Sequence, residues 1–254
     1  MKKAIIVTIL VALLSFFGGF ALKGIMVKDT QVNTVEEQTK QTHSFSEIKK
    51  IIDTYGDLFV DADSFSKVSK ENLRMRLFNN AFHREKKDIS LDEFNKMISE
   101  SAFNNVEIEA GDIGFDTGCS SLILYKYNKD SKKFEYQELP GHDCGFGSFP
   151  VTFDTIVDDY KFENNQYIVT EYAIYYRNVP EDKINFYGSR EDAENGSNSI
   201  DKMSYNSFKS EWNDYKISPY ISESMFEKHK NKLTKIIYTF EDKNGILTLT
   251  NVTK

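Results

Sequence analysis

The sequence predicts an α+β protein in which helices come first and a mostly antiparallel sheet follows. From Phe45 to Ala102, apolar residues recur at intervals of three and four, the period of helices that bury one face. Beyond Asn105 the pattern shifts toward alternation, and β-branched and aromatic residues flank short turns. Because helices and strands do not alternate regularly, we expect an antiparallel sheet rather than one built from β-α-β units.

The N-terminal segment, residues 1–27, has the pattern of a transmembrane anchor. The run from Ala4 to Leu22 contains no charged residue, and at helical rise it comes close to the roughly 20 residues that cross a bilayer core. Lys2 and Lys3 precede this run and are typical of a flank that stays in the cytoplasm. We therefore predict an N-terminal transmembrane helix in a single-pass protein of the cell membrane, with the C-terminal domain outside.

A cleaved signal peptide is the alternative for the same segment. Gly19 and Ala21 have the small side chains that a cleavage site requires, and a cut near Ala21 would release a secreted protein. The apolar run is longer than the roughly 7 to 15 residues of a signal-peptide core. Residues 24–27 also continue its apolar character beyond Lys23. These two features favour the uncleaved anchor.

A polar stalk and an acidic domain are expected after the anchor. Residues 28–43 contain two valines as their only apolar side chains, so we expect a solvated stalk, with the extracytoplasmic domain at residues 44–254. Without the four lysines of residues 1–28, 28 basic residues remain against 39 acidic ones, a formal charge of −11. Such a surface repels phosphate groups, so we expect no nucleic acid partner and no second membrane contact.

Three amphipathic helices are predicted at the start of the domain. The first covers residues 45–59, whose apolar side chains share one helical face. The second contains the apolar positions of residues 73–82, with Ser69 as its candidate N-cap. The third begins at a capping box, in which the Ser90 hydroxyl accepts a bond from the Glu93 amide and the Glu93 carboxylate bonds back to the Ser90 amide.

Three hairpins and a short helix are predicted in the second half. Residues 167–176 are apolar on both faces, so this strand is expected to be central. Residues 189–201 are polar and predict an exposed loop, and residues 222–235 predict a short helix. The hairpins pair residues 120–127 with 133–139, residues 152–162 with 167–176 around Asn164-Asn165, and residues 236–240 with 246–252 around an Asn-Gly turn.

The order and size of these elements resemble the NTF2-like proteins, which implies a cone-shaped sheet. The N-terminal span, the stalk, the aromatic-rich body and the closing hairpin with Tyr-Thr-Phe and Asp-Lys-Asn-Gly also resemble membrane-anchored extracytoplasmic proteins of low-GC Gram-positive bacteria. That resemblance implies no particular activity. We therefore expect a non-enzymatic, membrane-tethered domain that binds another envelope protein or a cell-wall component through a groove of its sheet.

One dense polar cluster offers an alternative function. Residues 141–147 read Gly-His-Asp-Cys-Gly-Phe-Gly, and a Cys144 nucleophile activated by His142 would make the protein a secreted or surface hydrolase. Catalytic cysteine and histidine usually come from separate elements, however, and no family signature surrounds this pair. We therefore predict no catalytic residue.

The two cysteines, Cys119 and Cys144, are interpreted as a disulfide pair. A disulfide is typical of two cysteines in an exported domain, and free thiols are the alternative. A structural zinc ion would require four ligands in paired short spacings, whereas only Cys119, His142 and Cys144 are at hand. We therefore expect neither a metal site nor a cofactor.

The remaining polar candidates are interpreted as structural. Asp57, Asp61 and Asp63 begin like a calcium-binding loop but lack its glycine and its closing glutamate, so they predict a solvated helix end. Histidines in polar stretches are expected at the surface, and the lone tryptophan is expected to cover the core; these residues are His43, His83, His229 and Trp212.

Overall fold

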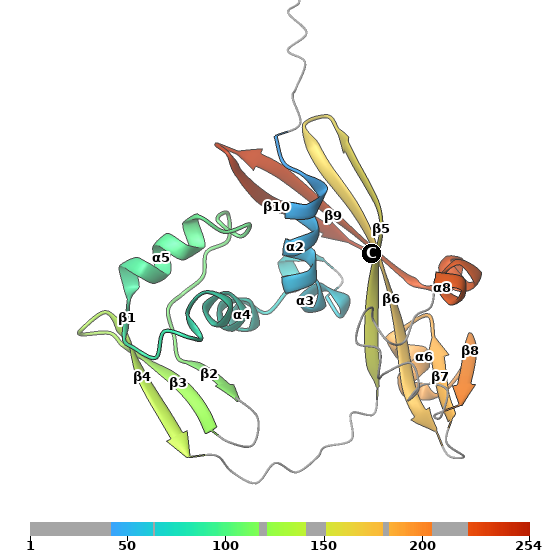
Figure 1. The fold of residues 1–254 in the computed structure, drawn as a ribbon, viewed down its shortest axis with the longest axis horizontal. Helices are drawn as coiled ribbons and strands as arrows, with labels where there is room; N and C mark the ends of the chain where they lie inside the picture. Colours follow the sequence, from blue (N-terminus) through green and yellow to red (C-terminus); the bar gives the residue numbers. More distant parts are fainter. Residues whose placement is uncertain (1–41, 63, 117–120, 141–150, 180–182, 205–222) are drawn as a thin grey trace, which may run out of the picture. The chain divides into compact units, whose positions relative to one another are not determined.

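The computed structural model describes residues 42–62, 64–116, 121–140, 151–179, 183–204 and 223–254 (Figure 1). Over these ranges the chain forms helices and two antiparallel sheets, which confirms the predicted α+β class. No helix within the described ranges is both long and apolar enough to cross a membrane. The predicted anchor at residues 4–22 lies outside these ranges, as do most of the stalk and the candidates Asp63, Cys119, His142, Cys144 and Trp212.

The first predicted helix is present and is interrupted once. Helix α2 spans Phe45–Tyr55, and helix α3 spans Asp57–Val60 after a break at Gly56. Ser44 caps α2, because its hydroxyl accepts from the Glu47 amide while the Glu47 carboxylate accepts from the Ser44 amide. The helix period places apolar residues of α2 against the large sheet.

The other two predicted helices begin at the predicted caps. The Ser69 hydroxyl accepts from the Asn72 amide at the start of α4, which spans Lys70–Phe82 after a single 3-10 turn, η1, at Phe65–Lys67. Helix α5 spans Leu91–Ser99 and begins at the predicted Ser90–Glu93 capping box. Both predictions are confirmed. Helix caps can be predicted from the sequence because the residues that form them lie close together in the chain.

The small sheet has the strand order β1-β4-β3-β2. The predicted hairpin forms β3 and β4, and Lys132 adopts a positive φ at its turn. Buried rings of Phe78, Phe94 and Phe134 join α4, α5 and β4, with centroid distances of 4.9 to 6.0 Å. The strands span Ile89–Ser90 (β1), Ile113–Asp116 (β2), Ser121–Asn128 (β3) and Lys133–Pro140 (β4).

The large sheet is built around β6, which confirms the prediction of a central strand. Strand β6 pairs with β5 along one edge, and with β9 and then β7 along the other. β-bulges interrupt β5 and β10, and the sheet is strongly curled (Figure 1). The strands span Thr152–Glu163 (β5), Gln166–Val179 (β6), Lys183–Tyr187 (β7), Asp201–Ser204 (β8), Thr234–Lys243 (β9) and Ile246–Thr253 (β10).

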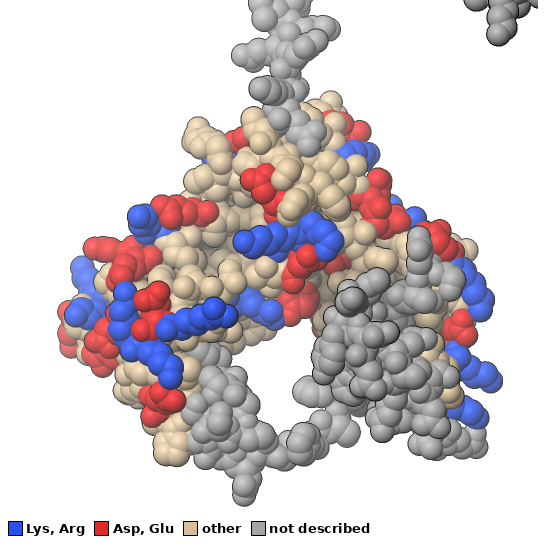
Figure 2. Space-filling model, viewed as in Figure 1, with Lys and Arg blue, Asp and Glu red and all other residues tan. Residues whose placement is uncertain are grey.

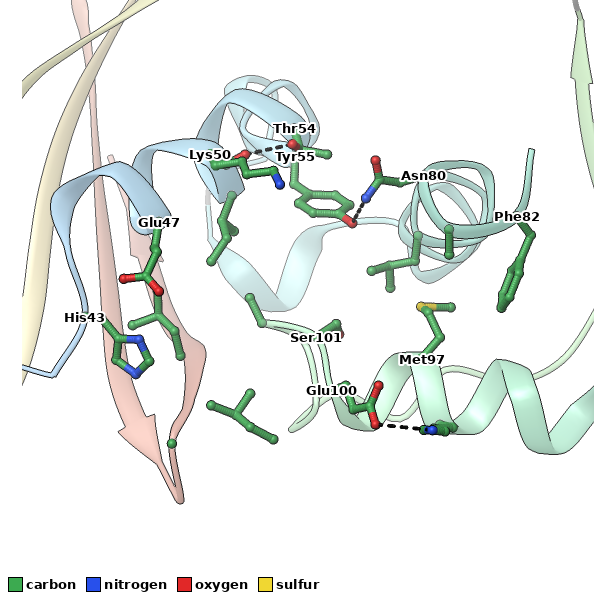
Figure 3. Close-up of a pocket in the computed structure, with 18 of the residues that line it drawn as sticks. His43, Glu47, Lys50, Thr54, Tyr55, Asn80, Phe82, Met97, Glu100 and Ser101 are labelled. Atoms are coloured by element: carbon green, nitrogen blue, oxygen red, sulfur yellow. Dashed lines mark hydrogen bonds and ion pairs between the residues drawn. The ribbon is translucent and has the colours of Figure 1, made fainter. Parts of the chain in front are cut away.

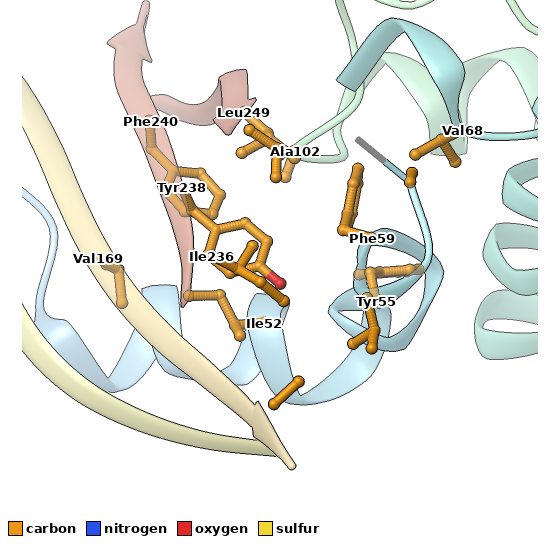
Figure 4. Close-up of a cluster of buried hydrophobic side chains, with 14 of the residues drawn as sticks. Ile52, Tyr55, Phe59, Val68, Ala102, Val169, Ile236, Tyr238, Phe240 and Leu249 are labelled. Carbon is orange, nitrogen blue, oxygen red and sulfur yellow. The ribbon is translucent and has the colours of Figure 1, made fainter. Parts of the chain in front are cut away.

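The main hydrophobic core lies where α2 and α3 cover one face of the large sheet. Figure 4 shows Ile52 and Phe59 from the helices beside Tyr238 of β9. The Phe59 and Tyr238 rings meet edge to face at 5.8 Å. Burial of large aromatic rings is the principal favourable contribution to folding in such a region.

Two sequence interpretations in the C-terminal half are corrected. Residues 189–201, predicted as a loop, contain helix α6 at Arg190–Asn195, since Ser189 caps its start and Gly196 ends it with φ 67°. Helix α8 (Glu223–His229) and the 3-10 turn η2 (Lys230–Lys232) form where a short helix was predicted. His229 was expected at the surface but is 5% exposed, and its ring is hydrogen-bonded to Asp201 at 2.8 Å.

Candidate ligand-binding groove

An open groove of about 720 Å³ lies between three helices and the turn of the closing hairpin (Figure 3). Its walls come from α2, α4 and α5, from Ser101 and Ala102, and from the β9–β10 turn at residues 245–247. Ligand pockets in proteins usually measure about 300 to 1,000 Å³. The groove therefore has the size of a binding site.

The floor of the groove is apolar. Ile51 of α2, Leu77 of α4, Met97 of α5 and Leu247 of β10 all line it. Ile51 and Met97 also contact the main core as partly buried residues, so the floor is continuous with the folded interior. Rigid helices therefore hold an apolar surface that remains open to solvent.

One hydrogen-bonded pair of polar side chains lies among the apolar residues that line the groove. The Asn80 side-chain amide donates to the Tyr55 hydroxyl at 3.2 Å, and the two side chains point toward each other from α4 and α2 (Figure 3). Burial raises the pKa of the Tyr55 hydroxyl, which therefore keeps its proton at neutral pH. No described residue accepts that proton, so the hydroxyl is free to donate to a ligand.

The rim of the groove carries both acidic and basic side chains. The carboxylates of Glu47 and Glu93 each accept two bonds from their cap serines, and these bonds lower both pKa values. Lys96 forms an ion pair with Glu100 at 3.8 Å. Within the described residues, the Lys50 ammonium has no carboxylate partner. The described lining of the groove therefore holds three glutamates and two lysines, more acidic than basic side chains.

The N-terminal border of the groove is a contact that we call the clasp, formed by Thr42 and His43 with Tyr167 and Asp242. The backbone amides of Thr42 and His43 both donate to the Tyr167 hydroxyl at 2.9 Å, and the Thr42 hydroxyl donates to Asp242 at 2.6 Å. The His43 side chain is only 13% exposed and lies 3.2 Å from Asp242. The prediction of His43 as a surface residue of the stalk is therefore wrong.

A second polar pair is sealed inside the main core. The Tyr238 hydroxyl donates to Glu171 at 2.6 Å, and the two residues are 1% and 2% exposed. Burial raises the pKa of Glu171, against the opposing effect of this hydrogen bond. Glu171 was missed because its only sequence signal is a lone acid in an apolar strand. Its enclosure indicates a structural role.

Two further titratable groups lie on the opposite face of the large sheet. Burial raises the pKa of Asp154 to about 6, although the Thr155 amide bonds to one of its oxygens. Burial would also raise the pKa of Asp201, but hydrogen bonds from His229 and Lys228 bring it down to about 2. Neither carboxylate lines the groove.

The residues singled out from the sequence are not brought together at the groove. Asp57 and Asp61 lie exposed at the two ends of α3, as expected of a solvated helix end, and form ion pairs with Arg76 and Arg190. Among the described residues, no group of three or more histidine, cysteine, aspartate or glutamate side chains is placed to hold a metal ion. The predicted Cys119–Cys144 bond and the alternative site at Cys144 and His142 lie outside the described residues.

No protein-family model, no curated protein and no solved structure matches this chain.

Proposed function

We propose that the chain is a membrane-tethered extracytoplasmic binding protein without enzymatic activity, which recognises another envelope protein in the groove of α2, α4 and α5. The observation that carries this proposal is the composition of the groove. An apolar floor with one partly satisfied polar pair beside it is typical of a binding site. Their capping bonds lower the pKa of the groove carboxylates Glu47 and Glu93, away from the neutral range in which a general acid or base works best.

The proposed tether is the uncharged run from Ala4 to Leu22, on the length and flank arguments given above. The curled sheet with α2 and α3 packed against one face supports the further proposal of an NTF2-like, cone-shaped architecture. In Figure 2, basic side chains lie among acidic ones on the face shown. This mixed surface and the acidic net charge favour a protein partner over a nucleic acid.

Protease treatment of intact cells tests the proposed location. We expect external protease to cut the domain, and cell fractionation to recover the full chain with the membrane. A chain that stays intact in whole cells but is cut after lysis would contradict the proposed topology.

Site-specific photocrosslinking tests the groove. A photoreactive amino acid at position 97, on the groove floor, should give an adduct with an envelope protein, and the same group at exposed Lys126 should not. Ala81→Arg should abolish the adduct, because Ala81 is exposed and lines the groove. Equal adducts from positions 97 and 126 would rule out the groove as the binding surface.

A further inference from the structure

Resting on that proposed function, we propose that the groove binds a segment of the partner protein in which a lysine or arginine lies beside apolar side chains. The apolar side chains contact the groove floor at Met97, and the basic group lies beside the carboxylates of Glu93 and Glu100. The backbone of the segment bonds to Tyr55 and Asn80.

Helix α5 presents two acids and an apolar side chain to the groove. Glu93, Met97 and Glu100 follow one another at spacings of four and three residues, so they share one helical face with Met97 one turn from each acid. Figure 3 shows Met97 and Glu100 on this wall. Lys96 also lines the groove, and its only ion pair is with Glu100 at 3.8 Å. The α5 wall therefore has one carboxylate in excess, close to an apolar contact surface.

The other two helices do not offset this excess. Glu47 and Lys50 both line the groove and are three residues apart on α2, so opposite charges are neighbours on that wall. Helix α4 contributes no charged side chain to the described lining. The histidine of the clasp, His43, lies 3.2 Å from Asp242. The excess of acid on α5 is therefore the excess of the whole described lining.

Both the local and the overall charge favour a basic occupant. Capping bonds lower the pKa values of Glu47 and Glu93, so both are ionised at neutral pH, and the bonds come from neutral serine groups that do not cancel the charge. Residues 29–254 carry 28 basic against 39 acidic side chains. The resulting field attracts a basic segment and repels an acidic one.

The preference for a peptide over a simple amine follows from Tyr55 and Asn80. Tyr55 is 9% exposed and lines the groove, and no described residue accepts its hydroxyl proton. A backbone carbonyl can accept that proton, and a backbone amide can donate to the Asn80 carbonyl oxygen. An alkyl ammonium or a polyamine has no acceptor for the buried hydroxyl, which would stay unsatisfied.

Selection from a library of short random peptides tests this inference. The target is the full chain in nanodiscs of zwitterionic lipid, because anionic lipid would itself retain basic peptides, and empty nanodiscs remove lipid binders. We expect the selected peptides to combine lysine or arginine with adjacent apolar residues. Ala81→Trp should lose them, because Ala81 is exposed and lines the groove, and the substitution fills space without changing charge.

Affinity measurements on one selected peptide give the second readout. Glu93→Gln removes the charge but keeps a side chain suited to the capping box, and should weaken binding roughly two- to fivefold, as expected of an exposed ion pair. Lys50→Gln should instead strengthen binding, because it removes a like charge. Glu71→Gln, the same change in the first turn of α4 outside the lining, should leave the affinity unchanged.

A change in the peptide completes the cycle. Replacing its basic residue by glutamine should weaken binding to the wild-type chain and remove the difference between wild type and Glu93→Gln.

The outcomes separate this inference from the proposed function. If selected peptides compete with the adduct at position 97 but lack basic residues, or if Glu93→Gln and Glu71→Gln weaken binding equally, the basic specificity is overturned and the groove remains a binding site. If no peptide is enriched over Ala81→Trp, the peptide inference fails. If position 97 also gives no adduct in cells, the proposed function fails with it.

Discussion

Helix α2 borders two regions that each contain a buried tyrosine, and the two tyrosine hydroxyls differ in their hydrogen bonds. On the core side, Tyr238 donates to Glu171, and both groups are sealed between α2 and the large sheet. On the groove side, Tyr55 accepts from Asn80 but gives its own proton to no described residue. The comparison separates a structural polar pair, whose bonding capacity is used, from one that keeps capacity for a ligand.

The largest effect is expected from Tyr238→Phe. Loss of the hydroxyl leaves the Glu171 carboxyl without its principal donor in the core, so the free energy of unfolding should fall by about 1.5 to 3 kcal/mol. Urea titration measures this loss. Adding Glu171→Leu should restore part of it, because removal of both partners is less costly than removal of one. A loss below about 0.5 kcal/mol would place Glu171 in contact with water instead.

The burial of Glu171 should also affect how the free energy of unfolding depends on pH. Burial raises the folded-state pKa of Glu171, so the folded state binds the proton more tightly than the unfolded state. The stabilisation that proton binding to Glu171 gives the folded state is fully present below the pKa of the unfolded state. It is lost as the pH rises through the pKa of the folded state. We therefore expect Glu171→Gln to make the fall in stability with rising pH shallower. Unfolding midpoints of the wild-type protein and of Glu171→Gln should be measured across the acidic pH range. Identical slopes of midpoint against pH in the two proteins would show that this assignment is wrong.

A smaller loss of stability is expected from Tyr167→Phe, which removes the acceptor for the amides of Thr42 and His43. Stability should fall by about 1 kcal/mol, and hydrogen exchange at those two amides should accelerate. Tyr127→Phe is the matched control, because no hydrogen bond of its hydroxyl is found among the described residues. Unchanged exchange at residues 42 and 43 would show that the clasp is open in solution.

The smallest effect on stability is expected from Tyr55→Phe. Asn80 is exposed and can bond to water once the hydroxyl is gone, so the loss should stay below about 0.5 kcal/mol. Its ratio to the loss in Tyr238→Phe measures the difference between the two regions. Equal losses in the two variants would mean that Tyr55 belongs to the closed core, which would remove the basis for its role in binding.

The helices and hairpins could be predicted because local signals determine them. Ser69 and the Ser90–Glu93 box lie within one turn of the helices they start, and Asn244 and Gly245 both adopt positive φ at the closing turn. Helix α6 was missed because its polar composition resembles a loop. Its cap serine and terminal glycine were nevertheless visible in the sequence.

The groove, the clasp and the two polar pairs could not be predicted, because they join residues far apart in the chain. Glu171 and Tyr238 are separated by 67 residues, and Thr42 and Tyr167 by 125. His229 likewise depends on Asp201, which lies 28 residues earlier. Periodicity shows which face of a helix is apolar but not whether a neighbour covers it. Ile51, which is only partly buried and lines the groove, therefore could not be distinguished from an ordinary core residue.

The clasp decides how mechanical force from the N-terminal side would enter the domain. Tyr167 lies at the start of β6 and Asp242 near the end of β9, in two strands that pair over eight registered positions. A pull on residue 41 would therefore be shared between neighbouring strands before it could unwind the first turn of α2. Because His43 also lines the groove, the same pull would distort the groove's border before it reached the aromatic core. For the binding function proposed above, tension would then change the border of the groove while the domain stayed folded.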